Sequence, residues 1–194
     1  MKSIEVPSFI KGLIFDCDGT LVDSMPLHMK AWEFAVVQSG AVWDYEFFFS
    51  KKGMPGKDII ELYNQYFPKK LSFEDAVKVK QEYFSTHRKD FQPIRPVVNI
   101  VLRYKDKLPM AVASGGTLEN VKIQLQSLGI YSFFKAIVTA DDNVEPKPSP
   151  NIFLEAAKQI DILPEYCQVF EDGDLGLEAA KKAGMAATDV RPFL

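Results

Sequence analysis

The amino-acid sequence predicts an α/β protein in which a doubly wound parallel sheet forms the core and an all-α domain is inserted into it. In the second half of the chain, short apolar runs alternate with amphipathic helical stretches, as βαβ units require. Nearer the N-terminus, a long segment has helical periodicity only. Acidic residues also follow two of the apolar runs directly, at strand ends where open α/β sheets bind ligands.

The strands and helices of the core are predicted from the period of the apolar pattern. Strands are expected at Leu13–Phe15, Met110–Ala113, Ala136–Thr139, Gln168–Phe170 and Ala186–Val190. The clearest helix is Thr117–Leu128, whose apolar residues fall on one face and which Gly129 ends. Helices at Pro150–Ile160 and Leu175–Ala183 follow, and this alternation predicts a parallel sheet.

Between the first two strands, the pattern is helical and offers no strand. Helices are expected at Leu27–Ser39, Lys57–Tyr66 and Phe73–Thr86. Prolines flank the segment, as they do in linkers between rigid bodies. We therefore expect residues 25–91 to form a helical cap over the strand ends, and residues 1–24 and 92–194 to form the α/β catalytic core. A helical elaboration that never moves is the alternative.

The composition is that of an ordinary globular protein, with 47% hydrophobic and 25% charged residues among 194. The net charge of −3 gives no reason to expect nucleic acid or an anionic membrane as a partner. The two cysteines, Cys17 and Cys167, lie in apolar runs and predict no disulfide framework. No apolar run approaches the roughly 20 residues that span a bilayer, and the N-terminus lacks a hydrophobic signal core. We expect a cytoplasmic monomer.

Two carboxylates, Asp16 and Asp18, follow the first predicted strand. Side chains alternate along a strand, so residues two apart point to the same side and these two would share one small site. Like charges at that distance repel each other unless a cation or a proton intervenes. A simple Asp/Gly turn after the strand is the alternative interpretation.

Three later features have the chemistry of a phosphate site. The Ser114–Gly116 loop precedes a predicted helix, where a hydroxyl and backbone N–H groups bind anions, although such a loop can also be a plain turn. Lys147 stands between two prolines that restrict its backbone, which predicts a contact with a phosphate or a carboxylate. Glu171 and Asp172 form a second acidic cluster at a strand end. Together these residues predict a site for Mg²⁺ and a phosphoryl group, whereas the two histidines lack the spacing of zinc ligands.

These motifs, in this order, resemble those of the haloacid dehalogenase superfamily of phosphotransferases. The residues that carry the resemblance are DCDGT at Asp16–Thr20, Ser114, Lys147 in KPSP, and FEDGD at Phe170–Asp174. PLHMKAW at 26–32 and AAKKAGMAATDVR at 179–191 are similar to the β-phosphoglucomutase-like group, most of all to its bacterial fructose-1-phosphate phosphatase branch. The resemblance implies a Rossmann-like core with a helical cap inserted after the first motif.

The resemblance also implies a role for each matched residue. Asp16 would be the nucleophile that forms an aspartyl-phosphate, and Asp18 would be the general acid and then the general base. The implied ligands of Mg²⁺ are Asp16, the backbone carbonyl of Asp18 and Asp172, with Glu171 either a direct ligand or a support of the other ligands. The residues implied to bind the phosphoryl oxygens are Ser114, Gly115 and Lys147.

The implied activity is Mg²⁺-dependent hydrolysis of a small sugar phosphate that resembles fructose-1-phosphate. A β-phosphoglucomutase-type phosphohexomutase is the alternative. In those mutases a cap arginine in a Gly-x-Ser-Arg loop grips a second phosphate, whereas residues 53–57 here read Gly-Met-Pro-Gly-Lys. Lys57 lacks the bidentate fork of arginine, which favours water as the final acceptor. A non-catalytic phosphate-binding protein is a remote alternative, because Asp16, Asp18 and Lys147 are all present.

The cap residues expected near the substrate are His28, Trp32, Lys57 and Lys80, with Lys78 as the alternative to Lys80. His28 and Trp32 are one helical turn apart, on one face of the first cap helix. The resemblance implies a histidine near the acid–base aspartate and a cap lysine that reaches toward the substrate. Packing in the core of the cap is the alternative for Trp32, and a structural hydrogen bond is the alternative for His28.

Overall fold

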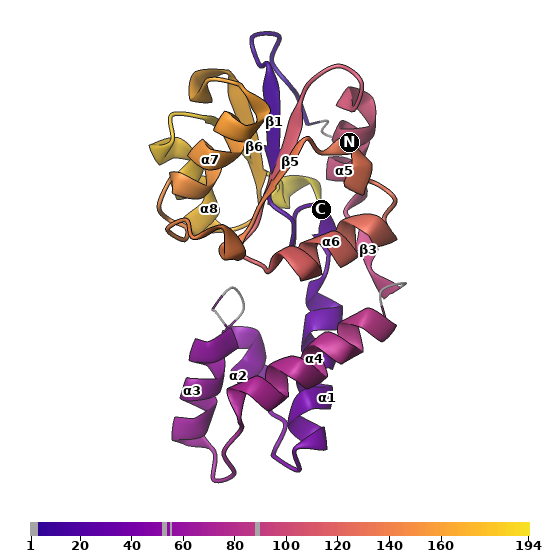
Figure 1. The fold of residues 1–194 in the computed structure, drawn as a ribbon, viewed down its shortest axis with the longest axis vertical. Helices are drawn as coiled ribbons and strands as arrows, with labels where there is room; N and C mark the ends of the chain where they lie inside the picture. Colours follow the sequence, from indigo (N-terminus) through magenta and orange to yellow (C-terminus); the bar gives the residue numbers. More distant parts are fainter. Residues whose placement is uncertain (1–3, 52–53, 55, 88–89) are drawn as a thin grey trace. The chain divides into compact units, whose positions relative to one another are not determined.

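The computed structural model describes residues 4–51, 54, 56–87 and 90–194. The chain forms two compact units, one of residues 1–23 and 91–194 and the other of residues 24–90 (Figure 1). They are called the core unit and the helical unit below. Among the described residues, no helix is both long enough and apolar enough to cross a bilayer.

The described part of the core unit contains a five-stranded parallel sheet. Its strands are β1 (Gly12–Phe15), β4 (Met110–Ala113), β5 (Ala136–Val138), β6 (Cys167–Glu171) and β7 (Ala186–Asp189). Their order in the sheet is β5-β4-β1-β6-β7, so β1 lies at the centre and pairs with both β4 and β6. Each strand begins and ends within one residue of its predicted bounds.

Helices cover both faces of this sheet. They are α5 (Arg95–Tyr104), α6 (Leu118–Ser127), α7 (Asn151–Ile160) and α8 (Asp174–Lys182), with short 3₁₀ turns at Tyr131–Phe133, Ala140–Asp142, Pro164–Tyr166 and Arg191–Phe193. Figure 1 shows α7 and α8 on one side of the sheet and α5 and α6 on the other. Ile14 of β1 packs in one apolar cluster with Phe153 and Ile160 of α7. Phe15 points to the opposite face, where its ring stacks on Phe170 with centroids 4.7 Å apart, so the doubly wound sheet is confirmed.

The described residues of the helical unit form four helices around an apolar core of their own. The helices are α1 (Met25–Gln38), α2 (Tyr45–Ser50), α3 (Gly56–Tyr66) and α4 (Phe73–Thr86). Trp32, Phe48 and Tyr63 are buried in that core. The sequence pattern predicts α1, α3 and α4 but misses α2, because six residues that include three successive phenylalanines are too few to show a helical period.

The two chain segments that join the units pair with each other. β2 (Val22–Asp23) and β3 (Gln92–Pro93) form an antiparallel pair, and the Ile94 N–H donates to the Leu21 carbonyl at 3.0 Å. The sequence predicts plain linkers here, and it also misses α5, which follows at once and carries Pro96 in its first turn. Proline fits that turn because the first N–H groups of a helix have no partner within the helix.

Candidate active site

Three neighbouring strands end at the same edge of the sheet, and each end carries a polar residue singled out by the sequence. Asp16 follows β1, Ser114 follows β4, and Glu171 is the last residue of β6. The register aligns Phe15 with Val112 on one side and with Phe170 on the other. Because β1 pairs with both neighbours, these residues gather at the carboxyl end of the central strand.

Lys147 joins two of the acidic residues. Its ammonium nitrogen lies 2.7 Å from Asp16 Oδ1 and 2.7 Å from Glu171 Oε2. The side chain of Lys147 is only 15% exposed, and those of Asp16 and Glu171 are 9% and 4% exposed. The ammonium also lies 5.0 Å from the centroid of the Phe153 ring on α7. The predicted contact of Lys147 with a carboxylate is therefore made twice.

Burial dominates the electrostatics of this cluster. It raises the pKa of Asp16, to which the nearby charge of Glu171 adds, although Lys147 opposes the shift. Burial disfavours the charged form of Lys147, but its two carboxylate partners and their hydrogen bonds outweigh that cost and raise its pKa. The pKa of Asp172 is also raised, mainly by burial. Three carboxyl groups and one ammonium therefore share a buried site, which disfavours full ionisation of the two aspartates.

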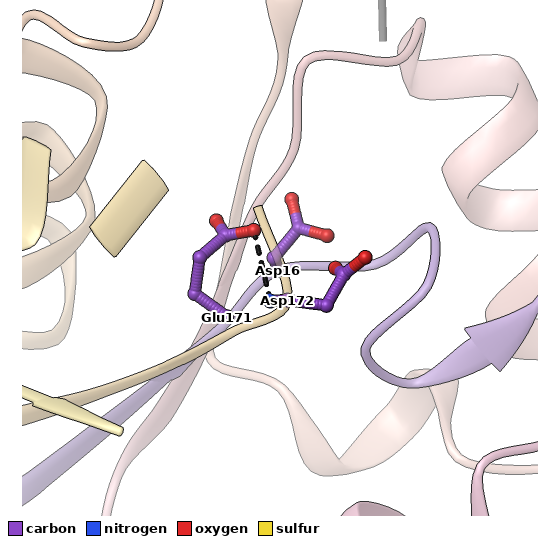
Figure 2. Close-up of side chains that lie close together, drawn as sticks. All are labelled: Asp16, Glu171 and Asp172. Atoms are coloured by element: carbon purple, nitrogen blue, oxygen red, sulfur yellow. Dashed lines mark hydrogen bonds between the residues drawn. The ribbon is translucent and has the colours of Figure 1, made fainter. Parts of the chain in front are cut away.

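Glu171 and Asp172 are fixed by different partners. Glu171 Oε1 accepts the backbone N–H groups of Asp172 and Gly173 at 3.1 and 2.9 Å. Asp172 Oδ1 accepts the hydroxyl of Thr20 at 2.9 Å, which links the first motif to the last. Figure 2 shows the carboxylates of Asp16, Glu171 and Asp172 close together, and one ligand atom from each lies within 4.8 Å of the other two. Clustered carboxylate oxygens are the ligands that Mg²⁺ prefers.

Two glycines make room for these carboxylates. Gly19 has a φ of +85°, and a Cβ atom there would lie 2.4 Å from Asp172 Oδ2. A Cβ atom on Gly176 of α8 would lie 2.0 Å from Glu171 Oε2. Gly176 is not predicted as a site residue from the sequence, although four small residues, Gly176, Ala179, Ala180 and Ala183, fall on one helix face. That face approaches the end of β6 so closely that a side chain at Gly176 would displace the Glu171 carboxylate.

The Ser114–Gly116 loop, which the sequence predicts to bind phosphate, lies beside Asp18. Ser114 is buried, and its hydroxyl accepts the Gly116 N–H at 3.0 Å. The point where a Cβ atom of Gly116 would stand is 3.3 Å from Ser114 Oγ and 3.5 Å from Asp18 Oδ2. Gly115 is exposed, with no atom within 4 Å of its own Cβ position. Asp18 and the Ser114 hydroxyl therefore border the same loop.

Asp18 also has a partner that the sequence analysis misses. The side-chain amide of Gln124, a buried residue of α6, donates to Asp18 Oδ1 at 2.9 Å. Its carbonyl oxygen accepts a hydrogen bond from the Cys17 thiol at 3.0 Å. Burial, with the nearby Asp18 and Asp16, raises the pKa of Cys17, which keeps it protonated. Both cysteines of the chain, Cys17 and Cys167, are buried free thiols.

In the helical unit, three of the predicted cap residues belong to one cluster. The Lys80 ammonium lies 4.3 Å from the centroid of the Trp32 ring and 5.4 Å from that of Phe84. The His28 ring packs against Phe84 with centroids 4.8 Å apart. Trp32 is 5% exposed and belongs to the apolar core, which agrees with the packing interpretation.

The other two candidate lysines of the cap, Lys57 and Lys78, are exposed. The Lys57 side chain is 68% exposed, and its ammonium lies 4.0 Å from Glu61 Oε1 on the same helix. Lys78 is exposed, whereas Lys80 is half-buried. Of the loop compared with the mutase motif, Gly53 and Pro55 lie outside the described residues.

Comparison with known proteins identifies the family. The model of the haloacid dehalogenase-like hydrolases matches residues 13–190, which include every core motif described above. The chain belongs to this family. The predicted resemblance is thereby confirmed, and the chain is an enzyme of the hydrolase class that the sequence indicates.

Several relatives of this haloacid dehalogenase-like hydrolase match over most of their length. Fructose-1-phosphate phosphatase YqaB of Escherichia coli (strain K12) is 34% identical over 180 residues, which are 93% of this chain and 96% of that protein. Beta-phosphoglucomutase of Bacillus subtilis (strain 168) is 27% identical over 93% of this chain and 83% of that protein. The crystal structure of CbbY from Rhodobacter sphaeroides in complex with phosphate is 28% identical, with a TM-score of 0.81 over 92% of this chain and 84% of that chain.

Proposed function

We propose that this haloacid dehalogenase-like hydrolase is a Mg²⁺-dependent phosphatase that hydrolyses a small sugar phosphate, similar to fructose-1-phosphate, through an aspartyl-phosphate on Asp16. The observation that carries the proposal is the buried Lys147 ammonium, which holds the Asp16 carboxylate at 2.7 Å beside a second acidic pair. A carboxylate fixed in this way at a strand end is suited to nucleophilic attack. The name of the E. coli relative, a fructose-1-phosphate phosphatase, supports the substrate class.

The reaction then follows from the groups around Asp16. A carboxylate oxygen of Asp16 attacks the phosphorus atom while the bond from phosphorus to the sugar oxygen breaks. Asp18 donates a proton to the leaving sugar oxygen, and later accepts a proton from the water that attacks the aspartyl-phosphate. The second step releases inorganic phosphate and restores the Asp16 carboxylate. Donors for the phosphoryl oxygens are Ser114, Gly115 and Lys147, which stabilise the charge of the transferring group.

The donor set of the site fits Mg²⁺. Three carboxylates lie together against the single positive charge of Lys147, and a divalent cation would balance the excess. We propose that Asp16, Asp172 and the backbone carbonyl of Asp18 hold the ion. Glu171 lies close by, but both of its oxygens already accept hydrogen bonds, so it mainly supports Lys147 and the 172–173 backbone. When bound, Mg²⁺ supplies charge neutralisation between the nucleophile and the phosphoryl group.

The high exposure of the Lys57 side chain favours hydrolysis over the mutase reaction. A mutase needs a firm grip on a second phosphate, whereas the Lys57 side chain is 68% exposed and lies near Glu61. We propose that substrate selection in the helical unit involves His28 and Lys80 instead, the two polar side chains that pack against Phe84. The monomeric state and the cytoplasmic location stay predictions from the sequence.

The test of this function is phosphate release with and without Mg²⁺ from a panel of phosphate esters. The panel contains fructose-1-phosphate, 6-phosphogluconate and β-glucose-1-phosphate, and the last is also assayed for glucose-6-phosphate. We expect free phosphate from one or a few of these sugars, and loss of that activity when EDTA removes the metal. Glucose-6-phosphate without free phosphate would instead establish a mutase, and an enzyme inert toward every ester would contradict both activities.

Gly176→Ala is expected to lower kcat/KM about ten- to a hundredfold while the protein stays folded. The added methyl group would occupy the position of Glu171 Oε2, so Glu171 must turn away and Lys147 loses one of its two carboxylates. Displacements of about 1 Å in a catalytic site have effects of this size. The measurement is steady-state kinetics, with circular dichroism to verify folding. Leu175→Ala, at an exposed position of the same helix, is the control, and equal activity of both variants would contradict the role of Gly176.

A further inference from the structure

We infer that Gln124 is a positioning residue for Asp18, fixing which of its carboxylate oxygens is presented for proton transfer. The inference rests on the acid–base role proposed above for Asp18. Gln124 lies on α6, more than a hundred residues away along the chain, and its side chain is almost fully buried. A buried amide needs hydrogen-bond partners for its polar atoms. The partners of the Gln124 amide are Cys17 and Asp18, in the loop that follows β1.

The orientation of the Gln124 amide is determined by its two partners. An amide has one acceptor oxygen and one donor nitrogen, a thiol can donate, and a carboxylate can only accept. With Oε1 toward Cys17 at 3.0 Å and Nε2 toward Asp18 at 2.9 Å, both contacts pair a donor with an acceptor. The reversed amide would set its oxygen against the carboxylate oxygen. Cys17 therefore orients Gln124, and Gln124 in turn orients Asp18.

The bond to Gln124 distinguishes the two oxygens of Asp18. Oδ1 accepts the amide N–H, whereas Oδ2 lies on the side of the phosphate loop, 3.5 Å from the Cβ position of Gly116. Ser114 Oγ is 3.3 Å from that same point, so Oδ2 is the oxygen on the side of the loop that we propose binds the phosphoryl group. A carboxyl group that rotates freely would present this oxygen only part of the time. Gln124 holds it in the productive orientation.

The test uses leaving groups that differ in their need for a proton. A sugar alkoxide must be protonated as it leaves, whereas p-nitrophenolate is stable without a proton. We expect Gln124→Met to lower kcat/KM about 10- to 100-fold for the best sugar phosphate and less than about threefold for p-nitrophenyl phosphate. A merely structural role would lower both values by the same factor. Gln126→Met, the same substitution at an exposed position two residues along α6, is the control.

Two comparisons make the outcome decisive. Asp18→Asn should show the same selective loss of kcat/KM for the sugar phosphate, only larger. If it lowers kcat/KM equally for both esters, the proposed acid role of Asp18 fails and the inference fails with it. If Asp18→Asn is selective and Gln124→Met is not, the inference alone is overturned. Should Gln124→Met fail to fold, Gln124→Asn replaces it, because it keeps a buried amide on a side chain one methylene shorter and so withdraws the N–H donor from Asp18. A uniform effect of that variant on both esters would also overturn the inference.

Discussion

Asp16→Asn is expected to lower the rate of phosphate release by at least about four orders of magnitude, because the amide removes the attacking oxygen's charge. The same variant should form no acid-stable phosphoenzyme when it is quenched during turnover. It should remain folded, since asparagine keeps the shape of the side chain and its oxygen can still accept from Lys147. The measurements are phosphate release under single- and multiple-turnover conditions and trapping of the phosphorylated protein.

Asp106→Asn is the matched control for this substitution. Asp106 is exposed in the core unit and lies outside the motifs, so full activity is expected. If Asp16→Asn kept more than about a tenth of the wild-type rate, another nucleophile or direct attack by water would be required.

Lys147→Met is expected to lower kcat about a thousandfold and to destabilise the protein by about 3 kcal/mol at neutral pH without divalent metal. The lysine is buried and is bonded to two carboxylates, so its removal leaves their negative charges uncompensated. The first effect is measured by steady-state kinetics and the second by urea unfolding. Lys158→Met is the control, because that lysine is 78% exposed and pairs with Glu155 only at the surface.

The stability loss of Lys147→Met should depend on pH. Burial and Glu171 already raise the pKa of Asp16, and loss of the opposing ammonium raises it further. A carboxyl group whose pKa is higher in the folded than in the unfolded state adds stability to the fold. This contribution is fully present below the unfolded pKa of about 4 and is lost as the pH rises through the folded-state pKa. The variant should therefore be closer to the wild type in stability at pH 5 than at pH 8. An identical difference at both pH values would contradict the account.

The strands, and the gathering of most candidate site residues at their ends, could be predicted from the sequence because the signals are local. An apolar run followed by Asp16, Ser114 or Glu171 marks both the strand and the end at which the candidate site lies. The prolines around Lys147 predict a restrained lysine, although its two partners, Asp16 and Glu171, lie 131 and 24 residues away in the sequence. Contacts over such separations depend on strand order, which the local pattern does not contain.

Elements too short to contain a full repeat of the apolar pattern were not predicted from the sequence. α2 has six residues, and β2 and β3 have two each, which is too short for a 3.6- or 2-residue repeat to be recognised. α5 was missed for another reason. Pro96 stands in its first turn, where proline is compatible with a helix, but Pro93 and Pro96 together are typical of a linker.

Gln124 was missed although the sequence contains a signal for it. It falls on the same face of the predicted helix Thr117–Leu128 as Val121, Leu125 and Leu128, where a polar residue interrupts an apolar stripe. Such an interruption indicates a buried polar side chain, and a buried polar side chain needs a hydrogen-bond partner. Its partners, Cys17 and Asp18, could not be identified without the fold.

The pairing of β2 with β3 has a consequence for how proteins of this kind can diversify. The inserted unit leaves the core at Asp23 and returns at Phe91, and the paired strands bring these two points together. A whole folding module can therefore be exchanged, enlarged or lost at one junction without lengthening or shifting any strand of the catalytic sheet. If the helical unit selects the substrate as proposed, reaction chemistry and substrate choice lie in separately replaceable parts of the gene, so one can evolve while the other is preserved.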